Sequence, residues 1–233
     1  SVSAKDGGTF SGTIAAAGLS TSSLGTSNFR AGVNAGNSIE AGGNYNTVVG
    51  DEAGTAITTG DYNTAVGKSA GAAVTTGAKN TIIGGLAGDA ITTGDNNTAV
   101  GYQSLSATTT ASQNTAVGLN SLKDNTTGAS NVAVGQAALS SNTTAASNTA
   151  VGYAALSVNT SGANNVAVGA LALDANTTGA DNTAIGYDAL TGNTTASNNT
   201  AVGKHAMGVN TSGTFNVAVG NYALDANTTA NNN

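Results

Sequence analysis

Twelve carboxylates and one histidine are the side chains of this 233-residue sequence that could serve as general acids, general bases or metal ligands. The carboxylates are Asp6, Glu40, Asp51, Glu52, Asp61, Asp89, Asp95, Asp124, Asp174, Asp181, Asp188 and Asp225. Their spacing matches neither an EF-hand loop nor a calcium-binding repeat. Asp51 and Glu52 could meet a cation together, but a solvated acidic pair is the more frequent arrangement. His205 stands alone beside Lys204, and we expect an ordinary surface residue.

Other kinds of chemistry find no support either. The sequence has no cysteine, which excludes disulfides, a thiol nucleophile and thiolate metal sites. Glycine pairs such as Gly84-Gly85 precede no Lys-Ser/Thr, so they do not predict a phosphate-binding loop. The net charge of −6 disfavours nucleic acid and anionic membrane surfaces as partners. The apolar stretch 13–19 is too short for a membrane span. We predict a protein without enzymatic activity, cofactor, nucleic-acid partner or membrane insertion.

The organising feature of the chain is a repeat of 17 residues. The motif that ends at Gly50 recurs with its glycine at every seventeenth position up to Gly220, and eleven units fill residues 46–232 without insertion or deletion. Numbered from Asn46 as position 1, the later units read Asn-Thr-Ala-Val-Gly-x-x-Ala-Leu-x-x-Asn-Thr-Thr-Gly-Ala-x. Asn233 opens a further unit. Fixed periods of this kind are the signature of stacked repeat architectures.

The residue types of the unit predict an all-β fold. Positions 2–4 form a short β-favouring run between asparagine and glycine, which are turn residues. Helical repeats need about 33 residues or more, so we expect each unit to be one coil of a parallel β-solenoid. Like residues would then stack about 4.8 Å apart, and eleven coils would form a rod on the order of 50 Å long. The predicted structural ladders are represented by Asn114, Val117, Gly118, Leu122, Asn125, Thr126, Asn131, Val134, Gly135, Leu139, Asn142 and Thr143.

A change of residue type at positions 9 and 12 between early and late units indicates that both positions face one interior. In the first three units position 9 is glycine and position 12 is isoleucine or valine, as in Gly54 and Ile57. In the last seven units position 9 is leucine or methionine and position 12 is asparagine, as in Leu122 and Asn125. We interpret the exchange as compensation within one cavity whose volume must be filled. The alternative is that two repeat lineages were joined.

The predicted interior is thin, with one valine, one leucine and some alanine per coil. A lone solenoid of this kind would be marginal and would need caps. The small residues at positions 3 and 8 would let another backbone approach closely, so we expect self-association, most simply as a homotrimer. End-to-end stacking is a further possibility.

Three copies of the motif resemble a known family. Asn131–Gly135, Asn165–Gly169 and Asn216–Gly220 are similar to the Ser-Val-Ala-Ile-Gly core of YadA-type head repeats, and Gln136-Ala137-Ala138 matches the residues that follow it. This resemblance implies a left-handed parallel β-roll in a trimeric adhesin on a bacterial surface. The longer phrase also resembles repeat arrays of phage tail fibres, including those of marine cyanophages, as does the segment 5–13. The repeat covers about 80% of the chain, and its longer period implies a wider loop per coil.

The remaining features concern the surface and the N-terminal segment. We read residues 1–45, which lack the 17-residue register, as a cap or subunit-joining segment preceding the β-roll of 46–233. Asn-x-Ser/Thr sequences recur at position 12 of the last seven units, from Asn125 to Asn227; they resemble glycosylation sites, but a hydrogen-bonded asparagine ladder is the better interpretation. Tyrosines at 102, 153, 187 and 222 are expected on an outer loop, where they could contact a glycan or a partner.

These observations leave three hypotheses about function. The first is a structural and adhesive fibre segment, from a phage tail fibre or a bacterial adhesin, at the virion surface or outside the cell, whose host receptor is a glycan or a protein. The second is a subunit of a self-assembling extracellular filament. The third is an ice-binding solenoid, because position 13 forms a regular threonine row: Thr126, Thr143, Thr160, Thr177, Thr194, Thr211 and Thr228.

Overall fold

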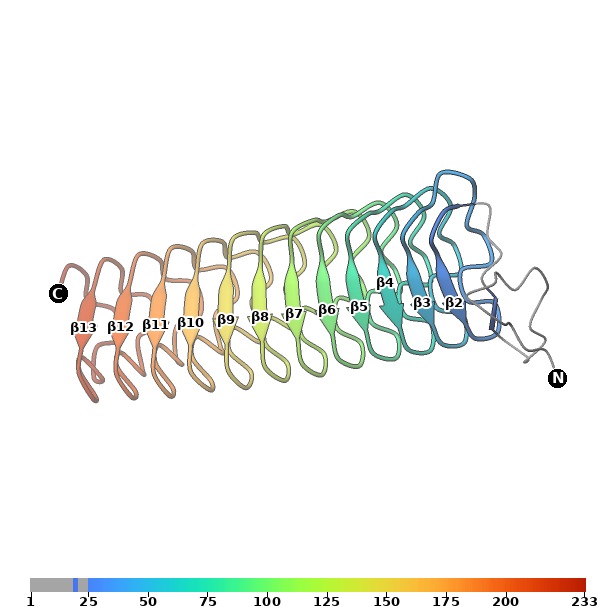
Figure 1. The fold of residues 1–233 in the computed structure, drawn as a ribbon. Coiled ribbons are helices and arrows are strands. Elements are labelled where there is room, and N and C mark those ends of the chain that lie inside the picture. The colour runs from blue at the N-terminus through green and yellow to red at the C-terminus, as the bar shows by residue number, and fades with distance from the viewer. Residues whose placement is uncertain (1–18, 21–24) are drawn as a thin grey trace.

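The protein is a rod of stacked coils (Figure 1). The computed structural model describes residues 19–20 and 25–233. Within them the regular structure is entirely β, in one 13-stranded sheet whose strands follow chain order. The strands are β1 (Leu19–Ser20), β2 (Phe29–Ala31), β3 (Thr47–Val49), β4 (Thr64–Val66), β5 (Thr81–Ile83), β6 (Thr98–Val100), β7 (Thr115–Val117), β8 (Val132–Val134), β9 (Thr149–Val151), β10 (Val166–Val168), β11 (Thr183–Ile185), β12 (Thr200–Val202) and β13 (Val217–Val219).

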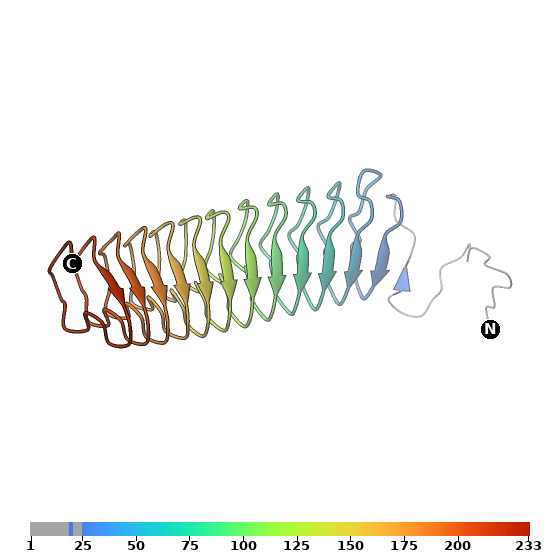
Figure 2. The same cartoon turned by 60° about the vertical axis from the view of Figure 1, so that its left-hand side comes forward.

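Strands β2–β13 are parallel and pair in register. Thr115 pairs with Val132 and Val117 with Val134, one repeat apart. Between strands the backbone hydrogen bonding continues around the coil, for example from Leu122 N to the Ala138 carbonyl at 3.0 Å. Hydrogen bonds therefore join successive coils at the strands and at the connecting segments, and the predicted parallel β-solenoid of 17-residue coils is confirmed. The strands lie side by side along the rod in both views (Figures 1 and 2).

The coil series begins before the boundary that the repeat predicts at residue 46. Strand β2 pairs in parallel with β3, with Phe29 opposite Thr47, so residues 28–45 form a coil of 18 residues. The extra residue lies between Glu40, which bonds to Thr58, and Gly43, which accepts a hydrogen bond from Asn28. The segment 28–45 thus belongs to the solenoid in this structure. The short β1 pairs antiparallel with β2; the apolar stretch and fibre-like motif predicted at 5–19 lie almost wholly outside the described residues.

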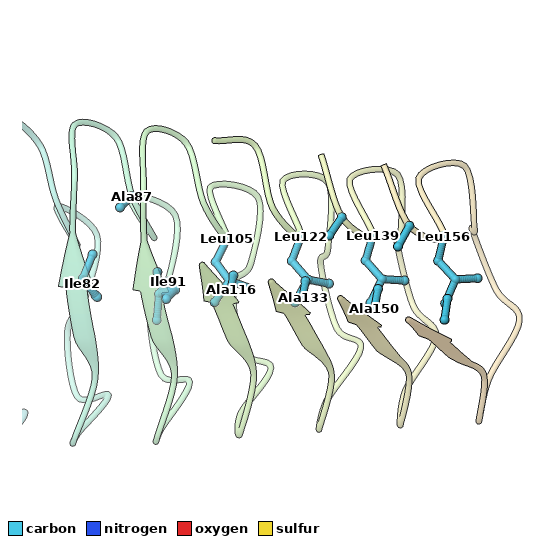
Figure 3. Packing of buried hydrophobic residues seen from close by; sticks show 14 of the residues in the cluster. Ile82, Ala87, Ile91, Leu105, Ala116, Leu122, Ala133, Leu139, Ala150 and Leu156 are labelled. Carbon is cyan, nitrogen blue, oxygen red and sulfur yellow. The ribbon is translucent and has the colours of Figure 1, made fainter. Parts of the chain in front are cut away.

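The interior is built from positions 3, 8, 9 and 12 of each coil. In the coil 131–147 the buried side chains at these four positions are Ala133, Ala138, Leu139 and Asn142, and successive coils repeat this packing (Figure 3). The prediction that position 4 supplies an interior valine was wrong. Side chains alternate along a strand, and here the alanine at position 3 points inward. Val117 and Val134 therefore lie on the outward side, where Val134 is 36% exposed.

The same packing rules out one reason given for self-association, namely that small residues at positions 3 and 8 would let another molecule approach. The small residues at positions 3 and 8, such as Ala116 and Ser121, are fully buried inside the coil. They are small because two opposite walls of a narrow coil meet there, so they cannot admit a neighbouring molecule.

Positions 9 and 12 share one interior space, as the exchange between them predicted. A Cβ added to Gly88 would lie 2.9 Å from Cδ1 of Ile91, which is closer than real side chains approach. A leucine at position 9 and an isoleucine at position 12 would therefore compete for the same space. Position 9 also has a left-handed backbone, with φ of 51° at Leu139, a conformation that costs a residue other than glycine about 1 kcal/mol. Glycine avoids this cost in the early coils, and leucine fills the interior in the later ones.

Candidate interaction surfaces

Two asparagine ladders run along the rod, and both are buried. At position 1, the backbone N–H of Asn131 donates to Oδ1 of Asn114 at 3.0 Å, and Nδ2 of Asn131 donates to the Ala145 carbonyl at 2.9 Å. At position 12, Nδ2 of Asn142 donates to Oδ1 of Asn125 at 2.8 Å and to the same Ala145 carbonyl at 3.0 Å. The two ladders thus converge on one carbonyl in each later coil and fix the corner between them.

The position-12 ladder decides between the two interpretations of the Asn-x-Ser/Thr sequences. Asn125, Asn142, Asn159, Asn176, Asn193 and Asn210 are fully buried. Each donates Nδ2 to a side-chain oxygen of the preceding coil. Their amides are engaged inside the folded coil, where they satisfy polar groups that would be costly to bury alone. The interpretation as a structural ladder is confirmed.

The threonine row at position 13 is also part of the coil-to-coil bonding. The hydroxyl of Thr126 donates to the Thr143 carbonyl at 2.9 Å, and that of Thr143 donates to the Thr160 carbonyl at 3.1 Å. The same bond recurs at Thr160, Thr177 and Thr211. These hydroxyl hydrogens are directed along the rod and not toward solvent.

The predicted corner glycines end the strands. Gly118 and Gly135 have φ of 135° and 138°. A Cβ added to Gly118 would lie 2.5 Å from the carbonyl oxygen of Gly135. Glycine is required there both by the backbone conformation and by the close approach of the next coil. Of the predicted ladder residues, the asparagines and leucines are therefore inside, the glycines lie at corners, and Val117 and Val134 lie on the outer face.

The outer face of the parallel sheet is a regular surface that runs along the rod. It presents position 2, which is threonine or valine, and position 4, which is valine or isoleucine, in every coil from 46 to 232. These side chains are half-buried to exposed; Ile83 is 39% and Ile185 40% exposed. We call this surface the Thr/Val face. Sequence reasoning missed it by placing position 4 inside; the signal was present in the unbroken valine and isoleucine row.

A second exposed row consists of tyrosines beyond the corner glycine. Tyr102, Tyr153 and Tyr187 at position 6 are 50–55% exposed, as predicted for an outer loop. Tyr222, at position 7, meets the His205 ring at 5.5 Å between centroids, with Nζ of Lys204 5.6 Å from its ring. Elsewhere, Tyr45 and Tyr62 stack at 4.9 Å.

The titratable groups do not converge on a site. Among the described residues there is no cluster of three or more His, Cys, Asp or Glu side chains suited to a metal ion, and the one ion pair is Lys123–Asp124 at 3.5 Å. Glu52 accepts a hydrogen bond from Ser69 at 3.1 Å, and His205 packs against Tyr222. Burial raises the pKa of the Asp89 carboxyl, against a smaller opposing effect of a backbone hydrogen bond, and its Oδ1 is buried with no hydrogen-bond partner.

A charged side chain lies at the N-terminal end of the interior. Arg30 occupies position 3 of the coil 28–45, where the later coils carry an apolar residue. Its Nε donates to the Ala35 carbonyl at 2.7 Å, and burial lowers the pKa of its guanidinium. Within the described residues, the interior therefore carries a charged group at its N-terminal end.

Comparisons with known proteins found no relative of this chain. No family model, no curated protein and no solved structure matches the chain significantly. No helix in the described part of the chain has the length and apolar character of a membrane span. The two exposed surfaces and the shape of the rod are the features of the molecule that bear on function.

Proposed function

We propose that the chain is a structural and adhesive fibre segment, part of a phage tail fibre or a bacterial surface adhesin, that acts as a rigid spacer in a homotrimer. The observation that carries the proposal is the Thr/Val face. Its valines and isoleucines stay in register over eleven coils although they point away from the interior.

An exposed apolar row of this length is a natural site of self-association. Soluble proteins rarely leave contiguous apolar patches of more than a few hundred Å² uncovered, and this row follows a rod of about 50 Å. It contains no charged residue at positions 2 and 4 from Thr47 to Val219, so copies can approach without charge repulsion. Three rods around one axis would bury the row on each copy in a closed, symmetric interface.

The shape of the rod supports a role as spacer. Each coil is bonded to the next through the backbone and through asparagine side chains, which makes the rod stiff along its axis. Repeated surfaces on a stiff trimer suit multivalent attachment, in which weak contacts add through high effective concentration. An extracellular or virion-surface location follows from this role.

The test is the mass of the protein in solution. We expect sedimentation equilibrium to give about three times the chain mass of 22.1 kDa. Replacing two outward valines with aspartate, Val134→Asp and Val151→Asp, should release monomers, because three copies would bring six carboxylates into the interface. The matched control is Thr144→Asp with Ser161→Asp on another exposed surface, which should leave the trimer intact. A monomeric parent protein, or an aspartate variant that remains trimeric, would overturn the proposal.

The two alternatives give other outcomes in the same experiment. A filament subunit would form polymers that grow with concentration and are visible by electron microscopy. An ice-binding monomer would leave the Thr/Val face free and show thermal hysteresis. In an ice-binding protein, the threonines at position 2, such as Thr115, would be the better candidates for contact with ice. The hydroxyl hydrogens of the position-13 row are already used in hydrogen bonds to the next coil.

A further inference from the structure

The tyrosine row lies in an uncharged strip on the loop side of the rod. From the coil 80–96 to the coil 165–181, positions 6 and 7 carry no charged residue. Position 6 of six successive coils is occupied by Tyr102, Leu119, Gln136, Tyr153, Ala170 and Tyr187. Lys68 precedes this strip and Lys204 follows it. The row is therefore uncharged up to the coil 165–181, and at its C-terminal end Tyr187 adjoins Asp188.

The aromatic side chains of the strip are available to a ligand. Tyr153 is 55% exposed and Leu119 42%. A Cβ added to Gly85 would lie 3.5 Å from Cδ2 of Tyr102, so this ring lies against the preceding coil and does not stand away from the rod. The turn at the corner glycine separates position 6 from the strand that carries the Thr/Val face. Association through that face and binding along the tyrosine row are thus compatible.

The chemistry of the strip suits a sugar chain. Aromatic rings pack against the C–H face of a pyranose, and tyrosine adds a hydroxyl at the edge of the contact. The amides of Gln103 and Gln136 lie at positions 7 and 6 in the same strip, where they can bond to sugar hydroxyls. Because the coils from Tyr102 to Tyr187 carry no basic residue at positions 6 and 7, and Asp188 adjoins Tyr187, an uncharged glycan fits better than an acidic one.

The spacing of the rings selects a linear ligand. Tyr153 and Tyr187 are two coils apart, about 9.6 Å, and Tyr102 and Tyr153 are three coils apart, about 14 Å. An extended β-1,4-linked glycan advances along its axis by nearly the same length per sugar residue as the solenoid does per coil. We infer that this row is a binding track for an uncharged, extended β-1,4-linked glycan that runs parallel to the rod. The inference rests on the proposed adhesive function and names its ligand class.

Calorimetric titration of the full chain with cellohexaose and with chitohexaose tests the inference. We expect saturable binding of at least one of them and no binding of maltohexaose, whose α-1,4 linkages curve the chain. Tyr153→Ala and Tyr187→Ala should each weaken binding about fivefold, and together by more. The control Tyr62→Ala removes an exposed tyrosine outside the row and should leave binding unchanged.

Two results would overturn the inference: neither hexasaccharide binds at millimolar concentration, or the double tyrosine variant binds as the parent does. Both tyrosines are exposed, so circular dichroism of the variants should match that of the parent and exclude misfolding. The outcome is separable from that of the proposed function. A trimer that binds neither sugar would refute the glycan track alone, and a monomer that binds would refute the trimeric fibre alone.

Discussion

At the scale of the residue, polar groups are tolerated inside this narrow rod because a ladder satisfies them. Asn131 and Asn142 are fully buried, and both use their amides in hydrogen bonds to neighbouring coils. Replacing one member would leave its neighbour unpaired, at a cost of about 1–3 kcal/mol. Asp89 is the contrasting case, because its Oδ1 is buried without a partner and burial raises the pKa of its carboxyl.

This difference predicts how stability depends on pH. A raised pKa means that the folded chain binds the Asp89 proton more tightly than the unfolded chain does. The ionised carboxyl therefore destabilises the fold, and its effect grows as the pH rises from the ordinary aspartate pKa through the raised one. We expect Asp89→Asn to raise the thermal unfolding midpoint at pH 7 and to lose that advantage at pH 3.

The measurement is thermal unfolding of the variant and the parent at both pH values, with Asp51→Asn, a change at an exposed carboxyl, as the control. An Asp89→Asn variant with the same midpoint as the parent at pH 7 would contradict the prediction.

At the scale of the element, the 17-residue period predicted the register of the strands but not which side chains of each strand point inward. Invariant spacing fixed the parallel register, as the pairing of Ala116 with Ala133 shows, because any other register would mismatch every ladder at once. A three-residue strand, however, offers two inward assignments, and the greater hydrophobicity of valine favoured the wrong one. The corner at Gly118 and the narrow interior select alanine, which depends on the three-dimensional path of the coil. The outward valine surface could therefore not be assigned from the pattern alone.

The coupling of positions 9 and 12 can be measured as a double-mutant cycle. Gly88→Leu alone should destabilise the fold by about 2–4 kcal/mol, because the leucine side chain would compete with Ile91 for the same interior space and would be forced into a left-handed conformation. Ile91→Asn alone should also destabilise by leaving a void. The double variant recreates the pair found at Leu122 and Asn125 and should be more stable than the sum of the single effects predicts.

Urea unfolding of the two single variants and the double variant gives the coupling energy. Gly88→Leu combined with Leu190→Ala, six coils away, is the control and should be additive. Additivity of Gly88→Leu and Ile91→Asn would mean that the residue exchange marks two joined repeat lineages and not compensation.

At the scale of the whole molecule, the rod is nearly one-dimensional. Each coil bonds to the coil before it and the coil after it, and strands β2 and β13 lie at opposite ends of the parallel series (Figure 2). Stability in such an array is close to a sum of coil terms and nearest-neighbour terms. Among the described coils, only the N-terminal one carries a charged side chain in the interior, Arg30, which donates to the Ala35 carbonyl, so the two ends of the stack differ. Lateral association through the Thr/Val face is consistent with this asymmetry.

The length of the rod should consequently be adjustable in whole coils. Deleting residues 131–147 joins Ser130 at position 17 to Asn148 at position 1 and restores every ladder, so the shortened chain should fold. The dependence of its unfolding free energy on urea should fall by about a tenth, in proportion to the surface removed. Deleting only residues 131–138 would put the glycine, leucine and asparagine rows of the two halves out of phase. That chain should lose its single cooperative transition in urea unfolding followed by circular dichroism. If the eight-residue deletion unfolded like the whole-coil deletion, the in-register ladders would not be what holds the rod together.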